Sequence, residues 1–124
     1  MTAKSDTLFK ISSIEYHDYS IHATLEINKD CDILKGHFPE QPVIPGACML
    51  QIVKDVLEDA LTASLRLKKA DHLKFIVMID PTTTPTVHLN LSYKFVTVDS
   101  FSVNAKIINS EVVCFKFQGA FIKE

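Results

Sequence analysis

The fold of this chain is decided by the stretch Gly36-His37-Phe38-Pro39-Glu40-Gln41-Pro42-Val43-Ile44-Pro45-Gly46. Three prolines, two glycines and one histidine fall within these eleven residues. Each proline fixes its own φ at about −65° and favours extended backbone in the residue before it. We therefore expect a stiff loop that holds the imidazole of His37 in one place.

A helix is predicted directly after this loop, from Gly46 to about Ser64. Pro45 comes immediately before it, and no proline or glycine interrupts the segment. Apolar side chains recur at helical spacing and form one broad face: Met49, Ile52, Val53, Val56, Leu57, Ala60 and Leu61. The opposite face is polar and carries Gln51, Lys54, Asp55 and Glu58.

The rest of the chain predicts β-strands, because its segments are apolar or alternate between apolar and polar side chains. These segments are Leu8–Glu15, Tyr19–Ile27, Leu73–Ile79, Thr86–Val96, Phe101–Ile108 and Val113–Ile122. One helix cannot cover both faces of such a sheet. We therefore expect an α+β fold in which a curved antiparallel sheet of roughly five or six strands wraps around one long central helix. The open edge strands favour pairing of two subunits.

The length and composition predict one domain over residues 1–124. The net charge of −2 gives no reason to expect a nucleic acid or an anionic membrane as a partner. The apolar runs are too short to cross a bilayer, and the first residues lack the apolar core of a signal peptide. We expect a cytoplasmic protein.

The cysteines and histidines give no sign of a metal site. Cys31, Cys48 and Cys114 are odd in number and match no zinc motif, so we expect free thiols. The other histidines likewise lack metal-ligand spacing: His17, His22, His72 and His88. We predict neither a metal nor a cofactor.

The loop and the start of the helix resemble the hot-dog-fold dehydratases that remove water from (3R)-3-hydroxyacyl chains on acyl carrier protein. In that family the motif runs His-Phe-Pro, two variable residues, Pro, two apolar residues and Pro-Gly. The segment from His37 to Gly46 matches it position by position. Leu73–Pro81 is similar to the family's strand after the helix, although the Pro-Gly-Asp that usually ends it is missing.

The resemblance implies a hot-dog fold, a dimer or larger oligomer, and an acyl tunnel at the subunit interface. It also implies a hydro-lyase reaction, the reversible dehydration of a 3-hydroxyacyl thioester to the trans-2-enoyl thioester. The thioester would be carried by acyl carrier protein or by coenzyme A. The chain also looks like a branch of the family from the biosynthesis of polyene pigments and related lipids, so we expect a role in fatty acid or polyene biosynthesis.

Dehydration needs a base for the α-proton, an acid for the leaving hydroxyl and a group that stabilises charge on the thioester oxygen. His37 is the candidate base, because an imidazole titrates at about pH 6.5. Gly46 is the candidate oxyanion donor, because the first N–H groups of a helix lack internal partners and lie at the positive end of its dipole. Phe38, Val43 and Pro45 are expected to line the acyl site.

Gln51 departs from the family pattern, which places a glutamate or an aspartate fourteen residues after the histidine. An amide cannot release a proton near neutral pH, so three interpretations stay open. His37 alone carries both proton transfers while Gln51 orients the hydroxyl or a water, which is the interpretation we favour from the sequence. Alternatively, Asp55 supplies the acid from one turn further along the helix. In the third, the chain is a non-catalytic acyl-binding subunit of a dehydratase heterodimer.

A hot-dog acyl thioesterase is a further alternative, although the His-Phe-Pro loop is not typical of those enzymes. The expected partners are therefore an acyl thioester and either an identical chain or a related subunit. A basic cluster made of Arg66, Lys68 and Lys69, with Lys74 nearby, is the candidate docking surface for acyl carrier protein, which is acidic.

Overall fold

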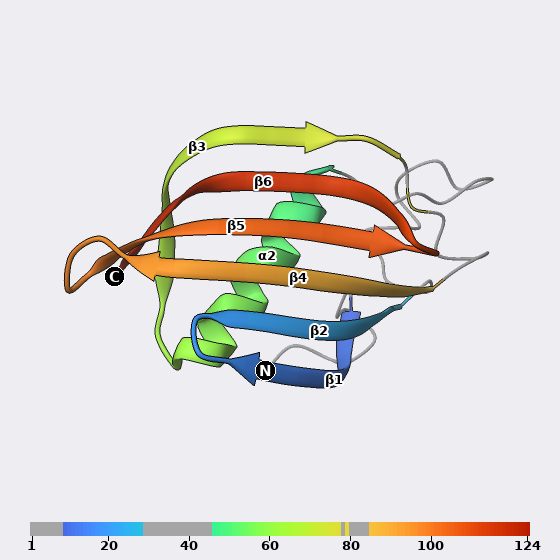
Figure 1. Cartoon of the computed structure of the whole chain (residues 1–124), viewed down its shortest axis with the longest axis horizontal. Coiled ribbons are helices and arrows are strands. Elements are labelled where there is room, and N and C mark those ends of the chain that lie inside the picture. The colour runs from blue at the N-terminus through green and yellow to red at the C-terminus, as the bar shows by residue number, and fades with distance from the viewer. Residues whose placement is uncertain (1–8, 29–45, 78, 80–84) are drawn as a thin grey trace.

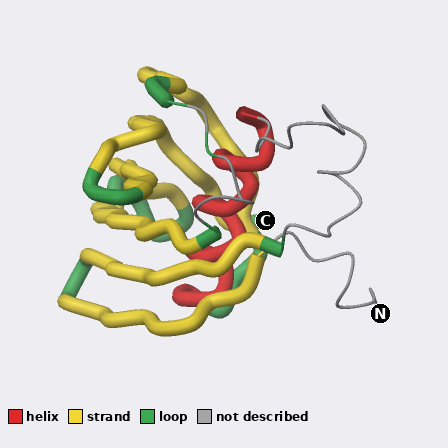
Figure 2. Tube along the Cα trace, turned by 90° about the vertical axis from the view of Figure 1, so that its right-hand side faces the viewer, coloured by secondary structure: helices red, strands yellow, loops and turns green. Residues whose placement is uncertain are grey.

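The structure is a computed structural model that describes residues 9–28, 46–77, 79 and 85–124. These residues form one antiparallel sheet of six strands and one helix, α2, which lies against one face of the sheet (Figures 1 and 2). Along the sheet the strands follow the order β1-β2-β4-β5-β6-β3. Their bounds are β1 Phe9–His17, β2 Ser20–Ile27, α2 Gly46–Leu61, β3 Leu65–Phe75, β4 Thr86–Phe95, β5 Ser100–Asn109 and β6 Val112–Lys123.

The core lies between α2 and the inner face of the sheet. Most of the predicted apolar face of the helix is buried, and the side chains of Val53, Val56 and Leu57 are completely inaccessible to solvent. Ala60 and Leu61, at the end of the helix, are half-buried. Leu25 and Phe115 meet them from the sheet and are equally inaccessible. Each such side chain contributes roughly 1.5–3 kcal/mol of transfer free energy on burial. The predicted α+β arrangement of one helix with five or six antiparallel strands is thus confirmed for the described residues.

The helix begins at Gly46, as the proline-glycine pair predicts, and ends at Leu61. Thr62 follows with a φ of 51°, a left-handed conformation that is common just after a helix. The N–H of Ala63 then donates to the Glu58 carbonyl oxygen at 3.2 Å. This backbone turn ends the helix about three residues before the predicted Ser64.

The strand predicted over Leu73–Ile79 is wrong in its position, because β3 runs from Leu65 to Phe75. Among the described residues β3 is an edge strand paired with β6 alone, and its register shifts twice, between Leu67 and Lys69 and between Ala70 and His72. These irregularities destroy the alternation by which a strand is recognised in a sequence.

No helix among the described residues has both the length and the apolar character that crossing a bilayer requires.

Candidate active site

The expected site centres on the loop from His37 to Pro45 and on the helix that follows it. His37, Phe38, Val43 and Pro45 lie outside the described residues, so the structure adds nothing to what the sequence predicts for them. It does place Gly46 as the first residue of α2. The first turn carries no acidic side chain, so the helix itself supplies no carboxylate to occupy the positive end of its dipole.

Gln51 and Asp55 form a pair on the polar side of α2. The Nε2 of Gln51 donates a hydrogen bond to Oδ1 of Asp55 at 2.7 Å. The two residues are four apart, which puts them one above the other on the helix surface. The Gln51 side chain is exposed and that of Asp55 is half-buried. The pair therefore holds an amide and a carboxyl together at one accessible point.

Burial raises the pKa of the Asp55 carboxyl above its ordinary value of 3.8. The hydrogen bond from Gln51 and the charge of Lys54 oppose this rise, whereas the charge of Glu58 adds to it. A carboxyl with a raised pKa holds a proton at a higher pH, which is the property that a general acid needs.

Asp55 also lines a shallow hollow of about 560 Å³ at the C-terminal half of α2. Glu58, Asp59 and Thr62 line the same hollow. The Asp55 carboxyl can therefore be reached from solvent in the single chain.

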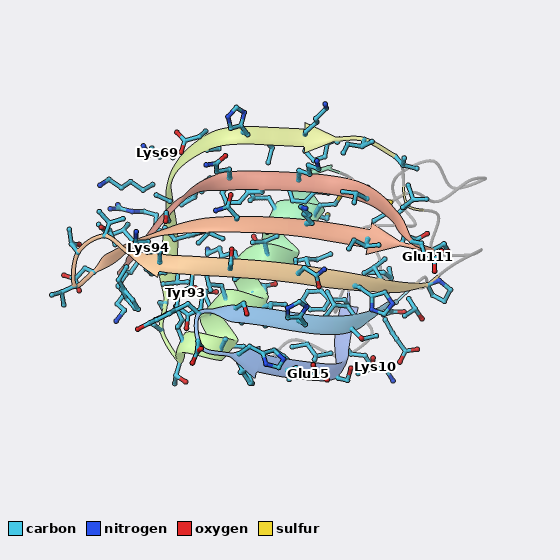
Figure 3. All side chains as sticks on the ribbon, in the orientation of Figure 1. Lys10, Glu15, Lys69, Tyr93, Lys94 and Glu111 are labelled. Atoms are coloured by element: carbon cyan, nitrogen blue, oxygen red, sulfur yellow. The ribbon has the colours of Figure 1, made fainter. Side chains whose placement is uncertain are left out.

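The structure does not gather the four predicted docking residues into one cluster. Arg66, Lys68 and Lys69 lie in the first half of β3, whereas Lys74 is close to its end. Lys69, labelled in Figure 3, forms an ion pair with Asp71 at 3.6 Å. Lys74 lies directly opposite Lys116 of β6. The compact cluster seen in the sequence is therefore spread along an edge strand.

Of the described cysteines, Cys114 is a buried free thiol, and burial raises its pKa, whereas Cys48 is half-buried near the start of α2. Cys31 lies outside the described residues. Within the described part of the chain, no group of three or more His, Cys, Asp or Glu side chains is placed to hold a metal ion.

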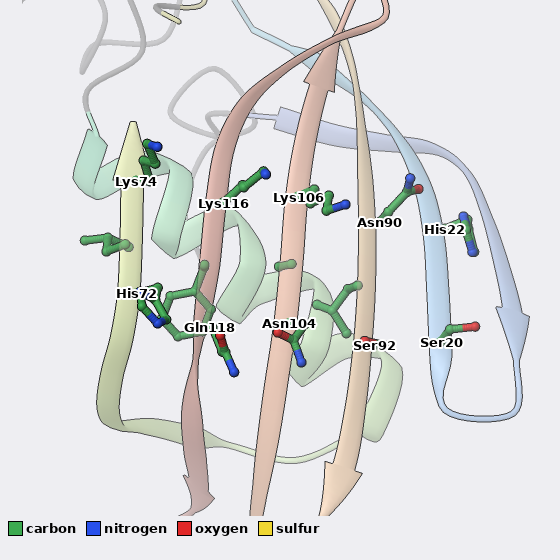
Figure 4. Close-up of a pocket in the computed structure, with 14 residues that line it drawn as sticks. Ser20, His22, His72, Lys74, Asn90, Ser92, Asn104, Lys106, Lys116 and Gln118 are labelled. Atoms are coloured by element: carbon green, nitrogen blue, oxygen red, sulfur yellow. The ribbon is translucent and has the colours of Figure 1, made fainter. Parts of the chain in front are cut away.

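One feature that sequence analysis missed is a hollow of about 630 Å³ on the face of the sheet away from α2 (Figure 4). His22 lines this hollow together with Lys106 and Lys116, two lysines that the sequence analysis does not single out. The outward position of the two lysines could be predicted from strand alternation. That they lie next to each other depends on the register in which the strands pair.

Solved structures with the same fold come from several bacteria. The conserved protein PA5202 from Pseudomonas aeruginosa is 14% identical, with a TM-score of 0.67 over 100% of this chain and 95% of its own. The dehydratase heterocomplex ApeI:P from Xenorhabdus doucetiae is 16% identical, with a TM-score of 0.68 over 92% of this chain and 97% of its own. A hypothetical thioesterase with coenzyme A from Streptococcus pneumoniae is 7% identical, with a TM-score of 0.66 over 94% of this chain and 85% of its own.

At these identities the likeness shows the fold alone, and it is the hot-dog fold that the sequence motif led us to expect. No curated protein matches the sequence. Residues 13–116, which run from β1 into β6, match the sequence family described as ApeI-like, ApeI dehydratase. Because that match spans the loop motif, α2 and most of the sheet, the chain belongs to the ApeI-like dehydratase family.

Proposed function

We propose that this chain is a dehydratase that converts a (3R)-3-hydroxyacyl thioester reversibly to the trans-2-enoyl thioester on acyl carrier protein. The observation that carries the proposal is the dehydratase family match over residues 13–116, which includes the motif from His37 to Gly46. In this proposal the chain acts in the cytoplasm, in fatty acid or polyene biosynthesis, and needs no metal or cofactor.

The reaction breaks one C–H bond and one C–O bond and forms one C=C bond. His37 takes the proton from the carbon next to the thioester carbonyl. The N–H groups at the start of α2, beginning with Gly46, stabilise the negative charge that develops on the carbonyl oxygen. A proton delivered to the hydroxyl then lets it leave as water.

The hydrogen bond between Gln51 and Asp55 supports Gln51 as the group that orients the hydroxyl, while the protonated His37 delivers that proton. Asp55 is nine residues after Gly46, about 13 Å along the helix, so its carboxyl cannot reach the hydroxyl of a substrate whose carbonyl oxygen is held at Gly46. Asp55 instead acts as a positioning residue, because it accepts the 2.7 Å hydrogen bond that holds the Gln51 amide. The mechanism keeps the interpretation favoured from the sequence and adds Asp55 as the residue that orients Gln51.

The reverse reaction gives a simple test. The purified chain is mixed with a trans-2-enoyl thioester on acyl carrier protein, and loss of the enoyl absorbance is followed together with appearance of the 3-hydroxyacyl product. We expect hydration by the wild-type chain and by Asp59→Asn, whose carboxyl lies further along α2. Release of free thiol without hydration would instead identify a thioesterase.

A second candidate is a non-catalytic subunit of a dehydratase heterodimer. Two points favour it: Gln51 stands where the dehydratase motif that the sequence resembles has an acid, and one structure of the same fold is a dehydratase heterocomplex. The test is Gln51→Glu measured beside the wild-type chain. Activity that appears only in the variant would support the non-catalytic role. Activity of the wild-type chain without any partner subunit would exclude that role.

Pairing with another chain is proposed for the edge strand β3. Leu73 and Phe75 of β3 and the two residues that follow it, Ile76 and Val77, are between 43% and 50% exposed in the single chain. A second subunit that covered these side chains would remove apolar surface from water and satisfy the unpaired edge. Arg66 and Lys68 remain the proposed docking residues for acyl carrier protein.

A further inference from the structure

Two rows of polar side chains cross the hollow on the outer face of the sheet, from strand to strand (Figure 4). The first row consists of Lys74, Lys116, Lys106, Asn90 and His22. The second consists of His72, Gln118, Asn104, Ser92 and Ser20. Within each row every residue lies directly opposite the next one in the register of the paired strands.

The first row places three lysines side by side. Lys116 lies opposite Lys74 on one side and opposite Lys106 on the other. Neighbouring strands are about 4.8 Å apart, and like charges that lie directly opposite each other destabilise a sheet. The ion pairs found in the described part of the chain join Glu15 to His17 and Lys69 to Asp71, so none relieves this repulsion.

Protection of a sheet edge does not account for the three lysines. Lysines on edge strands prevent unwanted pairing between sheets. That reason applies to Lys74, because β3 is an edge strand, but β5 and β6 are internal strands that carry Lys106 and Lys116. The internal pair therefore points to a negatively charged occupant of the hollow.

The second row contains no charged carboxylate and offers amides, hydroxyls and one imidazole. Such groups donate and accept hydrogen bonds and can orient a neutral polar molecule. The hollow of about 630 Å³ is within the range of small-molecule sites, roughly 300–1,000 Å³. The site thus combines a positively charged side with an uncharged polar side.

We infer that this hollow binds a small molecule that carries a phosphate group. Lys106 and Lys116 donate charge-assisted hydrogen bonds to the phosphate oxygens, and Asn104 and Gln118 bond the polar remainder. A second copy of this face would bring further lysines and no acid from its own hollow, so charge disfavours it as the occupant. The site lies on the face opposite α2 and does not depend on the proposed dehydratase chemistry (Figure 4).

The experiment titrates the isotope-labelled chain with inorganic pyrophosphate and with inorganic phosphate at constant ionic strength, and follows backbone amide shifts by NMR. The double variant Lys106→Gln/Lys116→Gln is compared with Lys10→Gln/Lys94→Gln. The control removes the same charge from two exposed lysines outside the hollow, both labelled in Figure 3.

We expect saturable pyrophosphate binding in the wild-type chain, with the largest shifts around Asn104, Lys106, Lys116 and Gln118. Loss of two charge-assisted bonds should weaken binding about tenfold or more in the first variant and leave the control unchanged. Equal weakening in both variants, or shifts that never saturate, would overturn the proposal. Binding of an acidic protein at these lysines without binding of pyrophosphate would overturn it as well.

Discussion

The side-chain amide of Gln51 and the carboxyl of Asp55 are joined by a 2.7 Å hydrogen bond across one turn of α2. Burial raises the pKa of that carboxyl. In the mechanism that we propose, Asp55 holds the Gln51 amide in place, and Gln51 orients the hydroxyl to which His37 delivers the proton.

Replacing Asp55 by Asn should keep the hydrogen bond from Gln51, because the Asn side-chain carbonyl oxygen still accepts. Asp55 positions Gln51 and donates no proton in the proposed mechanism, so we expect the dehydration rate to fall by less than about tenfold. The rate is measured at saturating substrate beside Asp59→Asn. A fall of about 10²–10⁴-fold, the usual contribution of one general acid, would assign the proton transfer to Asp55 and contradict the mechanism.

The same variant should alter the pH dependence of stability. Burial raises the pKa of folded Asp55 above 3.8, so the folded chain binds the proton more tightly than the unfolded chain. The stability that this group contributes is present below about pH 3.8 and is lost as the pH rises through the folded pKa. Asp55→Asn avoids that loss and should be more stable than wild type at pH 7.

The free energies of unfolding of Asp55→Asn and wild type should differ by less than about 1 kcal/mol at pH 7, because water screens a half-buried carboxyl. Urea unfolding at several pH values measures it, and the two curves should converge in acid. A variant that is less stable than wild type at pH 7 would contradict the raised pKa.

The core between helix and sheet should lose much stability when Leu57 is shortened, because the Leu57 side chain is completely inaccessible to solvent. Leu57→Ala should lower the free energy of unfolding by about 2–5 kcal/mol, through lost burial and the cavity that remains. Val98 is 84% exposed, so Val98→Ala should change it by less than about 0.5 kcal/mol. Similar losses in the two variants would show that α2 does not pack as described.

Gly119 of β6 lies where β3 passes closely. A Cβ at this position would collide with the backbone carbonyl oxygen of Lys69 and lie 2.6 Å from Cζ of Phe117. Gly119→Ala should therefore cost about 1–3 kcal/mol by overpacking, although alanine is the better strand residue. The neighbouring outward variant Gln118→Ala is the control in thermal unfolding. A Gly119→Ala variant that is as stable as wild type would mean that β3 can move away from β6 at this position.

The exposed apolar residues of β3 predict an effect on self-association. Leu73→Lys places a charge where the proposed partner subunit would bury an apolar side chain, so it should shift the chain towards the monomer. Sedimentation velocity over a range of concentrations measures the shift, with Val98→Lys as the control on the loop between β4 and β5. A wild-type chain that remains monomeric would exclude this edge as a homodimer interface.

Much of the fold could be predicted because burial differs between the two faces of the inner strands. Leu89 and Leu91 of β4 face α2, whereas His88 and Ser92 face outward, so the sequence alternates. β3 could not be placed in this way. Its pairing is one-sided and its register shifts twice, so position along the chain does not decide which side chains are buried. The apolar run beginning at Leu73 therefore predicted a strand that starts eight residues too late.

The Gln51–Asp55 pair and the lysine row on the outer face also differ in how far the sequence predicts them. The closeness of Gln51 and Asp55 follows from helical spacing alone, whereas the raised pKa depends on burial that the sequence does not show. The lysine row depends on a bulge. Around the Ser110-Glu111 turn Asn109 pairs with Val112, and an unbroken register would place Lys106 opposite Phe115. The irregularity between Ile107 and Ile108 places it opposite Lys116 instead.

Intact-protein mass spectrometry of acyl carrier protein loaded with a (3R)-3-hydroxyacyl chain measures whether this chain is a dehydratase. The carrier is incubated with the wild-type chain, and in parallel with His37→Ala. We expect the wild-type chain to remove the mass of one water from the loaded carrier, and His37→Ala to leave the mass of the carrier unchanged. A carrier mass that stays unchanged with the wild-type chain, both alone and with a related subunit, would contradict the proposed dehydratase activity.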